Sequence, residues 1–255
     1  MGSAPLIELD SPAPEAVDGR QIRAVAFQDV RLAYTAQVLE RVGRDTAGRA
    51  LVVGSGRGLL ARGLAGLGFD VTAVDPSRSA TAMARAAADR EHLDIDHRTA
   101  PAERLELPTA EFDLVYLADT LEITAGPGRV IEQVACALTP DGVLVYDTVN
   151  RTPVSRLVYL VAFQGLPMTR VMPAGRYAAR RLRTPAEVAA FLARHGLRNA
   201  DICDFKPRTV RSLITAVLAR RRGRITDDEV ARMVDFELAP DASPLVTYLG
   251  YARKA

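Results

Sequence analysis

A glycine-rich turn at residues 54–58 follows a short apolar segment, and this combination restricts the fold more than any other feature of the chain. Arg49–Val53 has the composition of a buried strand, and Leu59–Leu67 has apolar residues at helical spacing. Glycine suits a backbone that approaches a ligand closely, and a helix N-terminus favours negative charge. The sequence therefore predicts a strand–turn–helix unit whose turn binds a ligand through Gly54, Ser55, Gly56 and Gly58.

Strands and helices alternate along most of the chain. Strands are expected at 49–53, 70–74, 93–97, 112–117, 143–148, 200–205 and 245–252, and helices at 21–41, 59–67, 79–90, 127–138 and 184–195. The last helix begins with a capping-box pattern from Thr184 to Glu187. This alternation predicts an α/β fold with a mostly parallel sheet and helices on both faces.

The length of 255 residues favours one large domain with insertions. Residues 1–20 are rich in proline and acid, and we expect a loose N-terminal arm there, followed by a single domain at 21–255. Within that domain, an amphipathic segment with prolines at about 151–183 is expected to form a lid. An arginine-rich insertion is expected at about 208–234.

Composition is that of an ordinary soluble globular protein, with 48% hydrophobic and 25% charged residues. The 33 basic and 31 acidic residues nearly balance, so no polyanionic partner is required. Cys136 and Cys203 form neither a disulfide framework nor a metal-binding pattern. The first residues do not form a signal peptide, and the apolar run at 157–163 is too short to span a membrane. These features predict a cytoplasmic location.

The spacing of the glycines distinguishes between two classes of nucleotide ligand. A dinucleotide fingerprint has glycine or alanine three residues after its second glycine, where this chain has Leu59. Gly58 lies only two residues after Gly56, and this tighter turn predicts S-adenosylmethionine and disfavours a nicotinamide-linked reductase. Asp75 ends the second predicted strand, and its carboxylate, followed by Pro76, is expected to bind the ribose hydroxyls.

A third part of the ligand pocket is expected after the third strand, at Ala100–Glu103. Pro101 has no N–H group, so Ala102 and Glu103 are the candidates for contact with the adenine. Glu103 is alternatively a helix cap or a surface acid.

Several segments resemble the class I S-adenosylmethionine-dependent methyltransferases, and more narrowly the ubiquinone-biosynthesis O-methyltransferase group. The group's N-P-L-R-L-x-Y, M-E-x-L-E-H, T-L-N-R, V-P-x-G-x-H, K-P-x-E and V-N-Y-M segments correspond to 28–34, 118–123, 148–151, 172–177, 184–187 and 246–249. The resemblance implies a Rossmann-like sheet of seven strands, the last antiparallel, with helical lid insertions. It also implies that Arg31 binds the carboxylate of the cofactor and that Ala118 lines the pocket.

The chain departs from this group at a pair of acids. Asp119 and Glu122 keep the two carboxylates of the E-x-x-E-H segment, but Ile123 replaces its histidine. The two carboxylates could hold Mg²⁺ with waters, or they are a helix cap and a surface acid; we expect no metal site. The chain also lacks tryptophan and carries the extra insertion, which favours an acceptor other than a ubiquinone precursor.

Methyl transfer from a sulfonium mainly requires alignment of the methyl group with the acceptor, and a hydroxyl acceptor also requires a base. The candidate catalytic residues near the carboxyl ends of strands are Asp119, Glu122 and Asn150. An acceptor pocket could be formed by lid residues Tyr159, Phe163, Met168, Met172 and Tyr177, although these could equally be ordinary packing. The predicted reaction is O-methylation of a small phenolic or hydroxylated metabolite, such as a natural-product intermediate.

Other functions remain open at this point. They are N- or C-methylation of a small metabolite, and a cofactor-binding fold with altered activity. An RNA methyltransferase is disfavoured, because the arginines at 208–224 have no interleaved aromatic residues. Arginines around the apolar lid at 156–181 could contact a membrane surface. A homo-oligomer is also left open.

Overall fold

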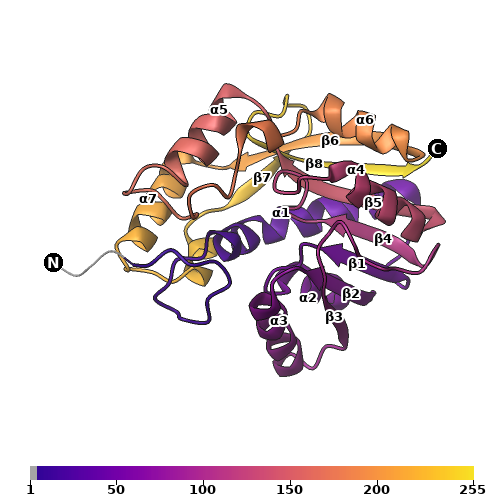
Figure 1. Cartoon of the computed structure of the whole chain (residues 1–255), viewed down its shortest axis with the longest axis horizontal. Helices are drawn as coiled ribbons and strands as arrows, with labels where there is room; N and C mark the ends of the chain where they lie inside the picture. Colours follow the sequence, from indigo (N-terminus) through magenta and orange to yellow (C-terminus); the bar gives the residue numbers. More distant parts are fainter. Residues whose placement is uncertain (1–4) are drawn as a thin grey trace.

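A computed structural model describes residues 5–255. It contains one eight-stranded sheet in the order β3-β2-β1-β4-β5-β8-β6-β7 (Figure 1). The strands are β1 (Arg49–Val53), β2 (Asp70–Asp75), β3 (Ile95–Thr99), β4 (Phe112–Leu117), β5 (Leu138–Val149), β6 (Leu197–Pro207), β7 (Phe236–Ala239) and β8 (Thr247–Lys254). Strands β1 to β5 are parallel, β8 is antiparallel to both β5 and β6, and β7 is antiparallel to β6.

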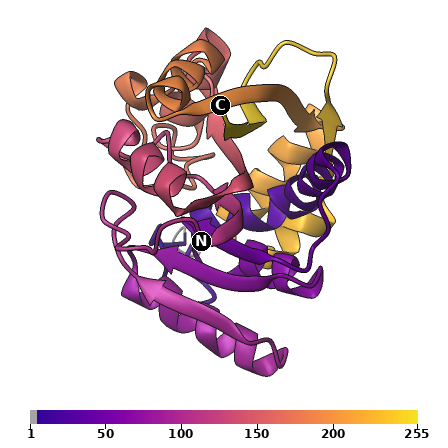
Figure 2. The same cartoon turned by 90° about the vertical axis from the view of Figure 1, so that its right-hand side faces the viewer.

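Helices cover both faces of this sheet, as the alternating pattern predicts (Figure 2). The α-helices are α1 (Gly19–Val42), α2 (Leu59–Gly66), α3 (Arg78–Arg90), α4 (Pro127–Ala137), α5 (Pro153–Arg156), α6 (Pro185–Arg194) and α7 (Val210–Arg221). Helices α1 and α2 pack on the face that includes Val52, whereas α4 and α6 pack on the face that includes Leu51 and Val53. Successive strand side chains point to opposite faces, so one apolar strand supplies both cores.

A third apolar cluster lies beyond the carboxyl ends of the parallel strands. It joins the lid, which includes α5, the π-helix η1 (Leu157–Ala162) and the 3₁₀-helix η2 (Ala179–Arg181), to α7 and the 3₁₀-helix η3 (Asp228–Arg232). Buried residues of the cluster include Tyr159, Met172 and Val217, together with Ile22 of α1. The lid and the arginine-rich insertion therefore pack against each other and against the start of α1.

The strand count differs from the expected seven. The additional strand β7 follows the insertion and pairs with β6 at the open edge of the sheet, from Asp204↔Ala239 to Pro207↔Phe236. Its residues are only partly buried, so the apolar pattern of this strand is weak in the sequence. The arginine-rich insertion is also more regular than a charge run suggests, since it contains α7 and η3.

The N-terminal segment also differs from the expected loose arm. We call its described residues 5–18 the strap; residues 1–4 lie outside the described part of the chain. Ile7 and Val17 form a β-bridge, and Asp18 caps α1 by accepting from the N–H groups of Arg20 and Gln21. Val17 and Asp18 are completely buried, so the end of the strap is fixed to the body of the protein. Within residues 5–255, no helix has the length and apolar character that a membrane crossing requires.

Candidate active site

The turn between β1 and α2 requires glycine at three positions for different reasons. Gly54, Gly56 and Gly58 have φ angles of 79°, 54° and 75°, in the left-handed region. A Cβ at Gly54 would collide with the carbonyl oxygen of Ala118, and one at Gly58 would lie 2.9 Å from the Cβ of Ala84 on α3. A Cβ at Gly56 would meet nothing closer than 3.7 Å. Gly58 therefore serves helix packing, whereas Gly56 faces open space above the turn.

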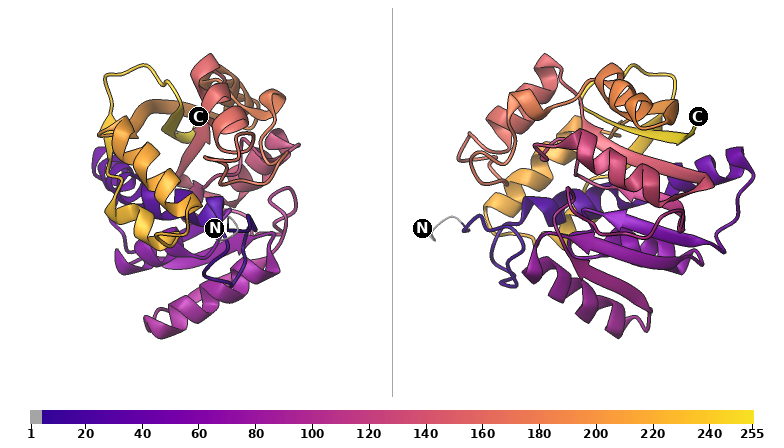
Figure 3. Two further views of the ribbon diagram at one scale, coloured as in Figure 1. Left: turned by 90° about the vertical axis from the view of Figure 1, so that its left-hand side faces the viewer. Right: turned by 45° about the vertical axis from the view of Figure 1, so that its right-hand side comes forward.

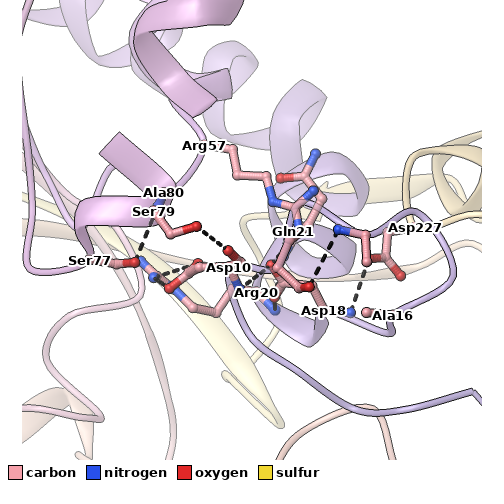
Figure 4. A network of polar contacts seen from close by, with 12 residues as sticks. Asp10, Ala16, Asp18, Arg20, Gln21, Arg57, Ser77, Ser79, Ala80 and Asp227 are labelled. Carbon is pink, nitrogen blue, oxygen red and sulfur yellow. Dashed lines mark hydrogen bonds and ion pairs between the residues drawn. The ribbon is translucent and has the colours of Figure 1, made fainter. Parts of the chain in front are cut away.

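Asp75 lies at the carboxyl end of β2 and is directed toward this turn. Its Oδ2 accepts a hydrogen bond from the Gly56 N–H at 2.8 Å, and its Oδ1 accepts one from the Ser77 N–H at 2.9 Å. The Nη2 of Arg20 lies 2.5 Å from Asp75 Oδ2, and the Nη1 of Arg20 lies 2.8 Å from an oxygen of Asp10. Arg20 therefore connects the buried Asp75 carboxylate to the strap, and Figure 4 shows its contact with Asp10.

Further polar contacts hold the strap over the turn (Figure 4). Ser79 Oγ donates to the Asp10 carbonyl at 2.5 Å, and Arg57 Nη2 donates to Asp18 Oδ2 at 2.8 Å. The Asp18 N–H donates to Asp227 Oδ2 at 3.0 Å, and Arg220 Nε donates to the other oxygen of Asp227 at 2.6 Å. The insertion, the strap and the glycine turn thus form one connected network, in which strap and insertion lie side by side (Figure 3).

A cavity of about 20 Å³ remains beneath the strap, which is room for about one water. We call it the turn cavity. Residues of the turn, the strap, α1 and the loop after β4 line it: Asp10, Asp18, Arg20, Gln21, Ala24, Arg31, Gly54, Ser55, Gly56, Arg57, Leu60, Ala118 and Asp119. The turn cavity is small because the strap and the side chain of Arg20 enter it.

An ion-pair cluster of two arginines and three acids lies next to the turn cavity. Arg31 Nη2 is 2.8 Å from Asp147 Oδ2 and 2.9 Å from Asp119 Oδ1. Arg23 Nη2 is 3.1 Å from Glu122 Oε1 and also contacts Asp119. All of these side chains are buried except that of Asp119, which is partly exposed to the turn cavity. The cluster has one more acid than base, which favours uptake of a proton by one of its buried acids.

The acids of the cluster differ in their protonation. Burial raises the pKa of Glu122 to about 7 and that of Asp147 to about 6, although the neighbouring arginines oppose this. Burial acts in the same direction on Asp119, but Arg23 and Arg31 outweigh it and lower the pKa of Asp119. Asp119 therefore stays ionised, whereas Glu122 and Asp147 can exchange a proton near neutral pH.

A second and larger cavity of about 350 Å³ lies on the other side of Arg23, and we call it the apolar cavity. Its walls come mainly from α1, the lid, the end of β6 and α7, and include Ile22, Tyr159, Phe163, Met172, Leu213 and Phe236. This volume is within the range of small-molecule sites. Three predicted lid residues, Tyr159, Phe163 and Met172, line it, whereas Met168 is exposed and Tyr177 packs against Tyr159.

Other predicted site residues lie outside both cavities. The Asn150 amide donates to the Pro244 carbonyl at 2.6 Å and so fixes the segment before β8. Glu103 accepts a hydrogen bond from Thr124, and the Ala102 carbonyl accepts one from Gln133 at 3.3 Å. Pro76 is exposed beside Asp75. The structure thus brings the glycine turn, Arg31, Ala118 and Asp119 together around the turn cavity. Asp75 and Glu122 adjoin it through ion pairs with Arg20 and Arg23, whereas Pro76, Ala102, Glu103 and Asn150 lie elsewhere.

Asp119 and Glu122 are neither a helix cap nor a surface acid. They lie in the loop after β4, where Glu122 is completely buried and both carboxylates face Arg23. Across residues 5–255, no three or more His, Cys, Asp or Glu side chains are grouped as metal ligands. A guanidinium group takes the place between these acids instead.

Sequence reasoning missed Arg20, Arg23, Asp18 and Asp147. Arg23 adjoins Ile22 within the helical apolar pattern of α1, and Asp147 interrupts an apolar strand. A charged residue within an apolar pattern is a usable signal, because such residues are seldom buried without a partner.

Comparison with known proteins supports the class that this geometry indicates. A family model described as a methyltransferase domain matches residues 51–146, from β1 into β5. The ubiquinone biosynthesis O-methyltransferase of Xanthomonas axonopodis pv. citri is 34% identical over 186 residues, which are 72% of this chain and 75% of that protein. The enzyme of the same name from Caulobacter vibrioides is 36% identical over 176 residues, 66% of this chain and 69% of that protein.

Solved structures share the fold. A SAM-dependent methyltransferase from Aquifex aeolicus has a TM-score of 0.55 at 14% identity, covering 90% of this chain and 91% of that one. An S-adenosylmethionine-dependent methyltransferase from Mesorhizobium loti has a TM-score of 0.58 at 22% identity, covering 89% of this chain and all of that one. This chain belongs to the class I S-adenosylmethionine-dependent methyltransferases. Within that class, the two curated relatives confirm its resemblance to the ubiquinone-biosynthesis O-methyltransferases.

Proposed function

We propose that this methyltransferase transfers the methyl group of S-adenosylmethionine to a hydroxyl oxygen of a small, largely apolar acceptor, such as a phenol. The observation that carries the proposal is the position of the two cavities. Helix α1 contributes to both, and Arg23 of the apolar cavity forms an ion pair with Asp119 of the turn cavity. A cofactor at the glycine turn and an acceptor in the apolar cavity would therefore be neighbours.

The residues of the turn cavity fit the cofactor. The absence of a side chain at Gly56 leaves room for the methionine part beside Ser55, and Arg31 suits its carboxylate. Asp75 would accept hydrogen bonds from the ribose hydroxyls after Arg20 leaves it. Ala118 lines the same cavity. Contacts of Pro76, Ala102 and Glu103 with the nucleoside remain predictions.

The ionised carboxylate of Asp119, which lines the turn cavity, supports binding of a positively charged cofactor. When bound, the cofactor supplies an electrophilic methyl group on a sulfonium. Asp119 stays ionised beside it, and Glu122, with a pKa of about 7, is a carboxyl that can take up a proton at neutral pH. We assign Asp119 to binding and Glu122 to proton uptake. Asn150 keeps the segment before β8 in place and has no direct part in the reaction.

A hydroxyl acceptor explains the buried carboxyl better than an amine does, because a free amine needs no base. The curated relatives are named O-methyltransferases, which also supports transfer to oxygen. The fold alone does not decide the reaction, since the [4+2]-cyclase SpnF shares it with a TM-score of 0.58 at 21% identity, covering 90% of this chain and 83% of that one.

The test is to incubate the protein with S-adenosylmethionine and matched pairs of apolar phenols and amines. Formation of S-adenosylhomocysteine is measured, and the products are identified by mass spectrometry. We expect transfer to phenols and a strong loss of rate in Glu122→Gln. Cofactor binding without transfer to any phenol would contradict the assignment of O-methylation.

The proposal also covers where in the cell the protein acts and which kind of acceptor it takes. Lid side chains Leu157, Leu166 and Met168 are exposed close to Arg156 and Arg170, which supports contact with an anionic membrane surface. Cys136 and Cys203 are both free, which supports a cytoplasmic location. The apolar cavity suits a natural-product intermediate as acceptor.

A further inference from the structure

The guanidinium group of Arg23 lies between the carboxylates of Asp119 and Glu122. Its Nη2 contacts Asp119 and lies 3.1 Å from Glu122 Oε1. The same nitrogen lies 3.7 Å from Asp147 Oδ2. A single buried nitrogen of Arg23 therefore faces three acids.

Arg23 is held from the opposite side by aromatic rings. Its Nη1 lies 3.1 Å from the Tyr177 hydroxyl, and its guanidinium carbon lies 5.1 Å and 5.2 Å from the ring centroids of Tyr159 and Phe27. Aromatic faces attract cations at such distances. Moving the guanidinium away would leave the buried Glu122 without its positive partner, which is costly. Arg23 is therefore a fixed part of the site.

A divalent metal ion does not fit these residues as they lie. Asp119 and Glu122 direct their oxygens at Arg23. The position of the histidine in the E-x-x-E-H segment is taken by Ile123, whose side chain packs with the apolar cluster of the lid. A metal ion would have to displace a buried guanidinium and would gain no imidazole ligand.

Arg23 also lines the apolar cavity, where the other cationic side chain is Lys206. Arg23 therefore belongs both to the ion-pair cluster and to the wall of the cavity that we assign to the acceptor. A guanidinium there favours an acceptor oxygen that carries negative charge, because a nearby opposite charge stabilises the ionised form.

We propose that Arg23 is the fixed internal cation of this methyltransferase. It stands between Asp119 and Glu122 where a divalent metal ion would otherwise bind, and it holds the ionised oxygen of the acceptor. The acceptor class is an apolar molecule with one acidic hydroxyl, such as a phenol or an enol. The part that concerns the acceptor rests on the proposed O-methylation, whereas the part that concerns the cation does not.

The role of Arg23 as the internal cation is tested first. Binding of Mn²⁺ to the full-length protein is measured by electron paramagnetic resonance. Wild type and Ile123→His are expected to show no saturable binding at millimolar Mn²⁺, because Arg23 remains in place in both. The double variant Arg23→Met/Ile123→His is expected to bind one Mn²⁺, about tenfold or more tightly than either. One tightly bound Mn²⁺ in wild type would overturn the proposal, whether or not any variant folds.

The contact with the acceptor is tested by the pH dependence of transfer to a phenol. Arg23→Met should move the rising limb of kcat/KM about one to two pH units upward, and Arg23→Lys should restore part of the shift. A variant that loses rate equally at every pH, or an Arg23→Lys that restores nothing, would overturn this role. Absence of transfer by wild type to any phenol would contradict O-methylation. The Mn²⁺ result would still decide whether Arg23 takes the place of a metal ion.

Discussion

Arg20 and the buried Asp75 form a partly buried ion pair, with 2.5 Å between Nη2 and Oδ2, at the carboxyl end of β2. Asp75 is the carboxylate that we assign to the ribose of the cofactor, so Arg20 occupies part of the space that the ribose needs. Asp10 holds the same guanidinium from the strap. On this assignment, binding of the cofactor requires that Arg20 turns away from Asp75.

Replacement of Arg20 should strengthen cofactor binding. Arg20→Ala removes a charge-assisted contact that competes with the ribose, and we expect a gain of about 1–2 kcal/mol, or about five- to thirtyfold in Kd. Isothermal titration with S-adenosylmethionine measures this. Arg78→Ala, at the exposed start of α3, is the control and should change nothing. Weaker binding by Arg20→Ala would show that Arg20 contacts the cofactor instead of competing with it.

Replacement of Asp75 should have the opposite effect. Asp75→Ala removes the acceptor of the ribose hydroxyls, and we expect a loss of about 1–3 kcal/mol in the free energy of cofactor binding. Asp70→Ala is a matched control, because Asp70 begins the same strand and its side chain is exposed. Equal affinities of the two variants, measured by the same titration, would refute the assignment of Asp75.

The stability of the protein should depend on the ionisation of Glu122. Its pKa is raised in the folded protein to about 7 from 4.5, so the folded state binds the proton more tightly than the unfolded state does. The contribution of Glu122 to the free energy of unfolding is thus unimpaired below about pH 4.5 and is lost as the pH rises to about 7.

Glu122→Gln removes this pH dependence. Relative to wild type, its free energy of unfolding should rise by up to about 3 kcal/mol between pH 4.5 and 8. Urea unfolding of both proteins across this range gives the difference at each pH. A difference that stays constant with pH would show that Glu122 titrates normally.

The contact between the insertion and the strap should matter for stability. Arg220 is buried, pairs with Asp227, and donates to the carbonyl of Ala16. Arg220→Met leaves the carboxylate of Asp227 without its partner, and we expect a loss of about 3–5 kcal/mol in the free energy of unfolding.

The neighbouring Arg222 provides the control for this prediction, because its side chain is exposed. Arg222→Met should change the stability by less than about 0.5 kcal/mol. Limited proteolysis should also cleave the strap faster in Arg220→Met than in Arg222→Met. Similar stability and cleavage in both variants would show that Arg220 does not anchor the strap.

Local patterns were sufficient to predict much of this molecule. The strand Arg49–Val53 and the capping box of Thr184 and Glu187 form as predicted, because each depends on neighbours within a few residues. The glycine turn and Asp75 could likewise be predicted, because each lies at the carboxyl end of one of two adjacent strands. The same reasoning predicts the fold class and the cofactor, since the spacing of the glycines is itself a local property.

The sequence by itself determined most of the order of strands and helices and the glycine turn to which we assign the cofactor. Only the tertiary structure decided what surrounds that turn. Arg20 meets Asp75 across 55 positions, Arg23 meets Glu122 across 99, and the N–H of Asp18 meets Asp227 across 209. Backbone periodicity extends over a few residues, whereas the partner of a buried charge depends on which distant segments the chain packs together.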